Sequence, residues 1–302
     1  MNLRKSTYIP VLIISFLLLI NLNVAAFSVQ EETARIDWER GIIAVQGEGV
    51  AAEHHIGGQA KLMAQRAARV DAYRNAAEFI DGVRVNSQTT MEDMVATSDR
   101  VDTQVRGFIE GALIVDSDYD PDLKISTVTM ELPLDGREGL AYYLEGEVQQ
   151  ESQERIDDVE EYIDQPKREI SPGEVIEIEE EVEQGIEYTS VVIDARGFDV
   201  VTALYPQVFD SQGYSLYGPT EVSSDNPANA SSLVAYSRSE EGIMGIDRVG
   251  DNPLVIEAAS VINRSGEAPT DLILDSDNAR LFRDLDKEHG IVERRAVVFI
   301  ID

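Results

Sequence analysis

The sequence predicts an α+β protein of two domains, and three observations lead to that prediction. The chain has 302 residues, more than the ~250 that a single hydrophobic core usually serves. Its hydrophobic content of 43% is that of a folded protein rather than a disordered one. Short apolar runs typical of strands and longer stretches of helical period occur on both sides of an acidic stretch at 145–187. We therefore expect domains at 27–144 and 188–302, joined by an acidic linker at 145–187.

Residues 1–26 have the pattern of an export signal. Arg4 and Lys5 precede an apolar run from Val11 to Leu22, and the small residues Val24-Ala25-Ala26 follow it. The run is about a dozen residues long, short of the ~20 needed to span a bilayer, which favours cleavage after Ala26. The alternative is that the segment stays uncleaved as a membrane anchor. The pattern predicts an extracytoplasmic protein, in the periplasm or the cell envelope.

In the first domain the strongest pattern is a helix at 59–81, rich in Ala, Leu, Met, Arg and Gln and ended by Gly82. Its wider apolar stripe contains Leu62 and Val70, and Arg66 falls inside that stripe. A second stripe of alanines suggests a helix packed on a sheet or another helix and covered on both sides, so Arg66 would need a partner. We expect its stem to pack and its head to reach a carboxylate or the rim, and the alternative is a binding role. The other expected elements are two strands within 34–50, a strand at 83–90, one or two helices at 91–109, a hairpin of strands 112–115 and 124–132, and a short helix at 136–144.

The stretch from Glu145 to Glu187 holds 17 acidic residues against three basic ones. Like-charge repulsion predicts an extended connector there, with a solvated helix at 151–163. Beyond it we expect an α+β domain with a mixed sheet and a helix at 278–288 that is capped by Asp275 or Asp277. Its expected strands are 190–193, 200–204, 207–209, 254–261, 272–274 and 296–301, and a second helix is expected at 228–239.

The helix at 59–75, with the sequence Gln-Ala-Lys-Leu-Met-Ala-Gln-Arg-Ala-Ala-Arg-Val-Asp-Ala-Tyr-Arg-Asn, resembles a known bacterial family. Together with Gly82-Val83-Arg84-Val85 and the block from Val105 to Ala112, it is similar to the LPP-twenty family of envelope lipoproteins. That domain is in turn similar to the N-terminal part of the flagellar assembly protein T. The resemblance covers about 36–133 and implies a small α/β domain that acts in the cell envelope through protein contacts.

The resemblance supplies no catalytic residues. The signature or structural positions that it matches are Arg66, Asp71, Tyr73, Arg74, Gly107 and Gly111, which we expect to maintain the fold. A lipoprotein of that family carries a lipidated cysteine, and this chain has no cysteine. A soluble exported form would therefore replace the anchored one.

The charge of the chain limits its partners. A formal net charge of -32 argues against nucleic acid and anionic membrane surfaces. The absence of cysteine removes disulfides and thiolate metal sites. The acidity fits either a saline habitat or an ordinary acidic extracytoplasmic protein, and weak binding of divalent cations is expected in both cases.

Three short motifs have unexceptional explanations. His54 and His55 are too close together for a helical zinc pair, so a surface loop is expected. Asp116, Asp118, Asp120 and Asp122 imitate a calcium loop, but Pro121 and Thr127 stand where that loop needs Gly and Glu, which favours a solvated hairpin tip. Gly47-Glu48-Gly49 has the wrong spacing for a phosphate cradle and is explained as a turn.

No nucleophile elbow, Walker loop, dinucleotide fingerprint or His-Glu-x-x-His motif occurs in the sequence. We therefore expect a non-enzymatic, cofactor-free envelope protein that acts through contacts with other envelope proteins, in flagellar or outer-envelope assembly. One alternative is an extracytoplasmic hydrolase that uses carboxylates of the second domain. Another is an envelope protein that only buffers cations.

Overall fold

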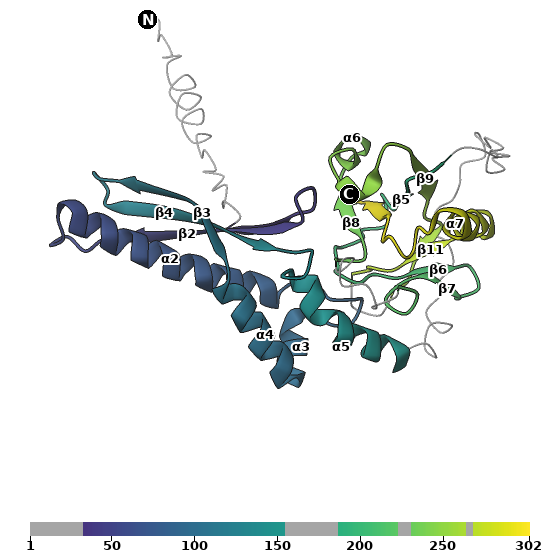
Figure 1. Ribbon diagram of the computed structural model, residues 1–302, viewed down its shortest axis with the longest axis horizontal. Helices are drawn as coiled ribbons and strands as arrows, with labels where there is room; N and C mark the ends of the chain where they lie inside the picture. The colour runs from purple at the N-terminus through teal and green to yellow at the C-terminus, as the bar shows by residue number, and fades with distance from the viewer. Residues whose placement is uncertain (1–32, 155–186, 223–230, 264–267) are drawn as a thin grey trace, which may run out of the picture. The chain divides into compact units, whose positions relative to one another are not determined.

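The computed structural model describes residues 33–154, 187–222, 231–263 and 268–302 (Figure 1). The predicted export signal, with its cleavage after Ala26, and most of the predicted linker lie outside these residues. The described part contains six α-helices and three four-stranded sheets, which confirms the mixed α+β class. Within it, no helix has both the length and the apolar character that crossing a bilayer requires.

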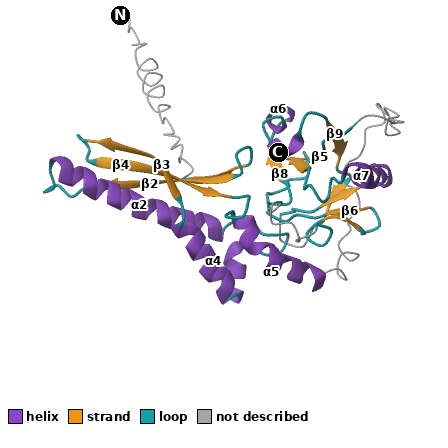
Figure 2. Ribbon diagram, viewed as in Figure 1, coloured by secondary structure: helices purple, strands orange, loops and turns teal. Residues whose placement is uncertain are grey.

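The first part of the fold is an antiparallel sheet with one long helix on one face (Figure 2). The strand order is β1-β2-β4-β3, and helix α2 lies along β2 and β4. The bounds are β1 (Ala34–Asp37), β2 (Ile42–Val50), α2 (Gly57–Asp81), β3 (Leu113–Asp120) and β4 (Ile125–Pro133). The predictions of two strands within 34–50 and of a helix that ends before Gly82 are confirmed.

The β3-β4 hairpin is longer than the sequence predicts. Strand β3 continues through Asp116 and Asp118 to Asp120, where a solvated tip was expected. The turn is confined to 121–124, and there Asp120 Oδ1 accepts hydrogen bonds from the backbone N–H groups of Asp122 and Leu123. Aspartate is depleted in strands, but β3 is an exposed outer strand whose carboxylates reach water.

Helix α2 packs on β2 through small residues. Its buried positions are Ala60, Ala64, Ala68, Ala72, Ala76 and Ile80. Opposite them, Gly47 and Gly49 lie within β2, so the prediction that they form a turn is wrong. A Cβ on Gly47 would stand 2.2 Å from the backbone nitrogen of Ala72, and one on Gly49 would stand 2.1 Å from that of Ala68. The two glycines therefore allow the backbones of helix and strand to approach closely.

The first half of the wider apolar stripe of α2 faces water, contrary to the prediction, whereas Ile80, in the second half of the same stripe, is buried. Leu62 is 60% exposed and Val70 is 70% exposed. Arg66, between them on the same stripe, is exposed as well and needs no buried carboxylate. The alanine stripe is the buried one because only small side chains fit against the glycines of β2. No described element covers Leu62, Arg66 and Val70 on the opposite side of the helix.

Three further helices follow α2 in the first part: α3 (Met91–Thr97), α4 (Asp99–Glu110) and α5 (Leu140–Glu154). The predicted strand at 83–90 is wrong, because this segment is a turn with a single bridge between Arg84 and Thr90. Asn86 Oδ1 closes the turn by accepting from the N–H groups of Gln88 and Thr89. Helix α5 continues past the predicted end at 144 because its apolar spacing extends to the buried Val148.

The second part contains two sheets. Strands β8 (Ala235–Ser237), β12 (Val297–Ile300), β5 (Ser190–Asp194) and β9 (Pro253–Glu257) form a parallel sheet in that order. Strands β10 (Ser260–Val261), β11 (Leu272–Leu274), β6 (Val208–Asp210) and β7 (Ser215–Tyr217) form a mixed sheet. The helices are α6 (Glu240–Ile243), the short 3₁₀ helix η3 (Asp247–Val249) and α7 (Ser276–His289).

Most predicted elements of the second part are confirmed. Helix α7 begins at a cap made by Asp275, whose side chain accepts from the N–H groups of Asp277 and Asn278, and it ends at Gly290 in the left-handed region. Two predictions are wrong. The segment 200–204 is not a strand, and the described part of 228–239 contains strand β8 instead of a helix.

Candidate binding site where the two parts meet

The part before residue 154 and the part after 187 contact each other within one compact unit, Thr33–Asp302. At their junction the backbone of Leu204 and Tyr205 runs beside the turn at 84–85. The N–H of Leu204 donates to the carbonyl of Arg84 over 3.0 Å, and that of Tyr205 donates to the carbonyl of Val85 over 2.8 Å. The Tyr205 hydroxyl donates to the carbonyl of Ala141 in α5. The apolar segment 200–204 is therefore buried by contacts across the junction rather than by a sheet.

Charged side chains are buried at the same junction. Arg295, only 3% exposed, forms an ion pair with the buried Glu145 of α5 and donates to the carbonyl of Ser231. Beside it, Arg248 reaches Asp135 over 3.4 Å and donates to the carbonyl of Ser232 over 3.0 Å. Each pair takes its carboxylate from the first part and its guanidinium from the second, so the two pairs fix one part against the other.

The second part contains three buried tyrosines, and two of them, Tyr205 and Tyr217, lie near this network. Burial raises the pKa of the phenols of Tyr205, Tyr217 and Tyr236 above the ordinary value, and the nearby carboxylate of Glu145 raises that of Tyr205 further. Each hydroxyl donates to a backbone carbonyl: Tyr205 to Ala141, Tyr217 to Leu233 and Tyr236 to Ala203. The phenols therefore remain neutral donors in the folded protein.

We expect Tyr205, Tyr217 and Tyr236, three of the 11 tyrosines, to stay protonated in the native protein when the pH passes about 10. Because the folded pKa is raised, the stabilisation is complete below the unfolded pKa of about 10 and is lost as the pH rises above it. An ultraviolet titration of phenolate absorbance measures this. Tyr205→Phe should remove one of the three late-ionising groups. Titration of every tyrosine near pH 10 with the fold intact would contradict the expectation.

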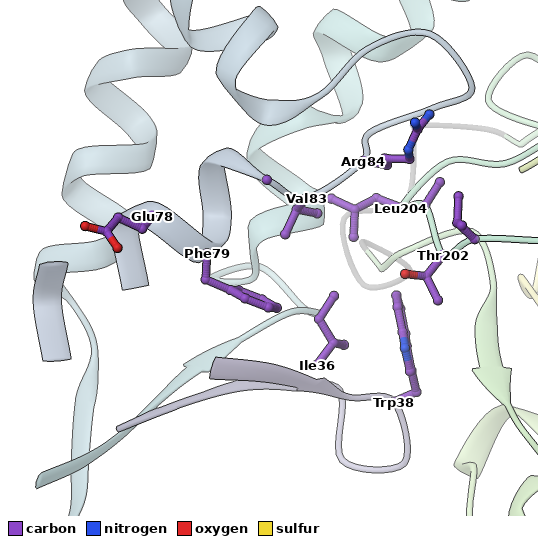
Figure 3. Close-up of a pocket in the computed structure, with 11 residues that line it drawn as sticks. Ile36, Trp38, Glu78, Phe79, Val83, Arg84, Thr202 and Leu204 are labelled. Carbon is purple, nitrogen blue, oxygen red and sulfur yellow. The ribbon is translucent and has the colours of Figure 1, made fainter. Parts of the chain in front are cut away.

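A pocket of about 430 Å³ opens at the junction (Figure 3). The side chains of Ile36 and Trp38, from the β1 hairpin, and of Phe79, from the end of α2, converge on it (Figure 3). The full lining is Ile36, Trp38, Glu78, Phe79, Gly82, Val83, Arg84, Val201, Thr202, Ala203 and Leu204. Trp38 is held from behind by Tyr236, with ring centroids 4.9 Å apart. One side of the pocket is therefore aromatic, and its Trp38 is packed against Tyr236.

The lining is mostly apolar and carries few polar side chains. Thr202 is its one hydroxyl side chain, and Glu78 and Arg84 are its charged side chains. The carboxylate of Glu78 points away from Trp38 (Figure 3). The lining contains no pair of facing carboxylates and no histidine, which are the usual acids and bases of hydrolysis. A pocket of this kind accommodates an apolar or aromatic group and orients it with a few polar contacts.

The predicted signature positions lie outside the pocket. Asp71 accepts a hydrogen bond from the N–H of Glu48 over 3.0 Å and so attaches α2 to β2, and Arg74 pairs with the same Asp71 at 2.6 Å within the helix. Tyr73 packs against the cluster that contains Met130. Gly107 lies inside α4 with open space where a side chain would be, and Gly111 ends that helix. With the exposed Arg66, these residues are not brought together into one site.

The motifs that were weighed as metal ligands and explained otherwise, His54 with His55 and the aspartates at 116–122, also lie outside the pocket. The rings of His54 and His55, in the loop before α2, lie with their centroids 4.1 Å apart and their planes tilted by 46°. Among the residues that the structure describes, no group of three His, Cys, Asp or Glu side chains could hold a metal ion. The buried carboxylates in this part of the chain have donors of their own: Glu145 has Arg295, Asp210 has Arg283, and Asp271 accepts from Gln207. These contacts lend no support to the hydrolase alternative.

Sequence reasoning missed the residues of the junction. Trp38, the single tryptophan, was expected only as part of a strand, and the run at 200–204 only as a strand. Glu145 was placed at the start of the linker and Arg295 received no role. Two signs in the sequence could have indicated the junction. One is the single tryptophan, Trp38, just before Gly41, and the other is the apolar run at 200–204.

Residues 190–302 match a family model described as Treponema pallidum Tp0624, second domain. The match begins at the first residue of β5 and ends with the last residue of the chain, so it covers the parallel and mixed sheets and α7. No curated protein matches the chain. The second part is therefore similar to that domain, whose description names no activity.

Proposed function

We propose that this chain is an exported protein of the cell envelope that acts by binding another envelope protein, in flagellar or outer-envelope assembly. Three features support the proposal: the export pattern of residues 1–26, the resemblance of 36–133 to the LPP-twenty family, and the junction pocket. The acidic composition agrees with a protein partner, because a net charge of -32 disfavours nucleic acid.

The pocket is the observation that carries the proposal. Its aromatic residues Trp38 and Phe79 are partly exposed although they are strongly apolar, and aromatic side chains in such pockets contribute most of the binding energy in protein interfaces. Both parts of the chain contribute to it, so the pocket exists only when they are assembled. A partner that inserts an apolar side chain would therefore recognise the assembled protein.

Photo-crosslinking in the native host tests this proposal. A benzophenone amino acid in place of Thr202 would stand at the pocket, and we expect it to form a discrete adduct with an envelope protein. Trp38→Ala in the same chain should reduce the adduct by about tenfold or more, as the loss of an aromatic anchor does. The adduct is measured by immunoblotting and identified by mass spectrometry.

The matched control carries the benzophenone at Arg280, an exposed position on α7 far along the chain from the pocket. We expect no adduct with the same protein from that position. Equal adducts from both positions, or an adduct that Trp38→Ala leaves unchanged while the variant melts like the parent, would overturn the proposal. Val201→Trp, which fills the pocket from a partly exposed position beside the benzophenone, is a second variant in case Trp38→Ala fails to fold.

A further inference from the structure

The outer side of α2 is basic in an otherwise very acidic chain. Arg66 and Arg69 are exposed there, and Lys61, also exposed, lies at the edge of this side towards Tyr119 and Lys124; we call these three residues the cationic face, and the helix has no acidic residue before Asp71. Two exposed aliphatic side chains, Leu62 and Val70, flank Arg66 one turn before and one turn after it. The cationic face therefore combines positive charge with apolar surface.

The face of the β1-β2-β4-β3 sheet that points away from α2 is acidic. Val128 and Met130 of β4 are buried against α2, so their neighbours Thr127 and Thr129 point to the other face of the sheet. In register with these threonines are Glu48, Asp118 and Asp116, all of them exposed, and we call this trio the acidic face. Exposed aliphatic side chains accompany this face too: Val50 at 63% and Leu113 at 67%.

The two faces lie back to back at the same place in the fold. Gly49 contacts the backbone of α2 at Ala64 and Ala68, and Arg66 projects from the other side of the helix between those alanines. Glu48, the neighbour of Gly49, projects from the other side of the sheet. None of the described helices packs on that sheet face (Figure 2). One copy thus presents opposite charges, each with aliphatic neighbours, on two opposite surfaces.

We propose that copies of this chain associate head to tail, with the cationic face of one copy against the acidic face of the next. The charges match across such a contact, and the exposed leucines and valines of both faces are covered by it. Because the two surfaces differ, the contact is heterologous and can continue from copy to copy. It involves neither the junction pocket nor its partner, so it stands or falls separately from the proposed function.

A bilayer surface fits these faces less well. The repulsion from a net charge of -32 acts on any approaching anionic plane as a whole, whereas a second copy brings its carboxylates to the cationic face at short range. The aliphatic surface around Arg66 is also narrow for an interfacial helix, which buries a continuous apolar face. A second copy is therefore the occupant that the charges favour.

Sedimentation velocity of the full exported chain across the micromolar range tests the proposal. We expect the average mass of the wild type to rise with concentration. The helix variant (Lys61→Glu, Arg66→Glu, Arg69→Glu) and the sheet variant (Glu48→Lys, Asp116→Lys, Asp118→Lys) should each weaken association by about tenfold or more, because like charges then face each other. The variant that combines all six changes should regain association, because it restores opposite charges with the wild-type net charge.

The design separates the contact from general repulsion. The sheet variant is less negative than the wild type, so general repulsion alone would make it associate more strongly, whereas the proposal requires weaker association. An equimolar mixture of the helix and sheet variants should associate although neither does so alone. All substituted side chains are exposed, so melting temperatures should stay close to that of the wild type.

A matched control places three charge reversals, Arg238→Glu, Arg280→Glu and Lys287→Glu, on exposed positions of the second part and should leave association unchanged. The proposal would be overturned if the wild type stays monomeric across the concentration range, or if the variant with all six substitutions does not regain association. Binding of the wild type to anionic vesicles without self-association would overturn it as well. The crosslink from position 202 would still report separately on the proposed function.

Discussion

Replacing Gly49 by alanine is expected to destabilise the protein by about 3 kcal/mol, the upper end of the usual cost of overpacking. A Cβ at this position would stand 2.1 Å from the backbone nitrogen of Ala68 and 2.4 Å from the carbonyl oxygen of Ala64. Backbone atoms cannot rotate away as the end of a side chain can. The helix would have to move off the strand, and its buried alanines would lose their contacts. Urea unfolding followed by far-ultraviolet circular dichroism measures the change in free energy.

Gly107→Ala is the matched control for Gly49→Ala. Gly107 also lies inside a regular element, α4, but a Cβ there has no atom within 4 Å. Alanine should leave the stability unchanged or raise it by up to about 1 kcal/mol, because glycine is a poor helix former. If the two variants unfold at the same urea concentration, the close packing of α2 on β2 does not make a side chain at position 49 destabilising.

The face of α2 that is buried could have been chosen correctly from the sequence. Ranking the two stripes by hydrophobicity favours Leu62 and Val70 over the alanines. The better criterion is complementarity, since two glycines at alternate positions of a strand, Gly47 and Gly49, offer room only to a helix face of equally small residues. An exposed stripe with Arg66 at its centre then needs no buried partner, and its exposure leaves a surface for another molecule.

The elements that sequence reasoning misplaced share a physical cause. Residues 200–204 are apolar and buried, as a strand would be, but their burial comes from the turn at 84–85 and from Trp38. The local pattern records that a segment is buried and not which distant segment covers it. The elements with their own end signals were predicted well: α7 has a capping aspartate and a terminal glycine, and α2 ends at Gly82.

The junction itself could not be predicted from local pattern. Glu145 lies at the start of a strongly acidic stretch, and nothing in the sequence of that stretch distinguishes it from the other acidic residues there. Arg295 follows another arginine near the end of the chain, and it is the buried member of the two. The pairing depends on how the two parts pack, and the candidate pocket depends on the same packing. The signature positions of the resemblance, which are local, led to α2 and away from the pocket.

Arg295→Met is expected to destabilise the protein by about 3–5 kcal/mol, the usual cost of removing one partner of a buried ion pair. The change leaves the carboxylate of Glu145 buried without its cation and removes the hydrogen bond that Arg295 donates to the carbonyl of Ser231. Glu145→Gln should be comparably costly, since it leaves the guanidinium without a counter-charge. Because the pair joins the two parts of the chain, the fluorescence of Trp38 at the junction should change in the same transition that circular dichroism follows. Urea unfolding with both probes measures the effect.

The double variant Glu145→Gln, Arg295→Met decides whether the loss comes from the uncompensated charge. With both charges removed, the loss in the free energy of unfolding should be smaller than the sum of the two single losses by at least about 1 kcal/mol, as expected for residues in direct contact. Arg106→Met is the control, because Arg106 forms an exposed pair with Asp102 along α4, and losing such a pair costs about 0.3–0.5 kcal/mol. Additive single effects, or an Arg295→Met variant as stable as Arg106→Met, would mean that the junction is held by its apolar contacts and by the backbone bonds of Leu204 and Tyr205 alone.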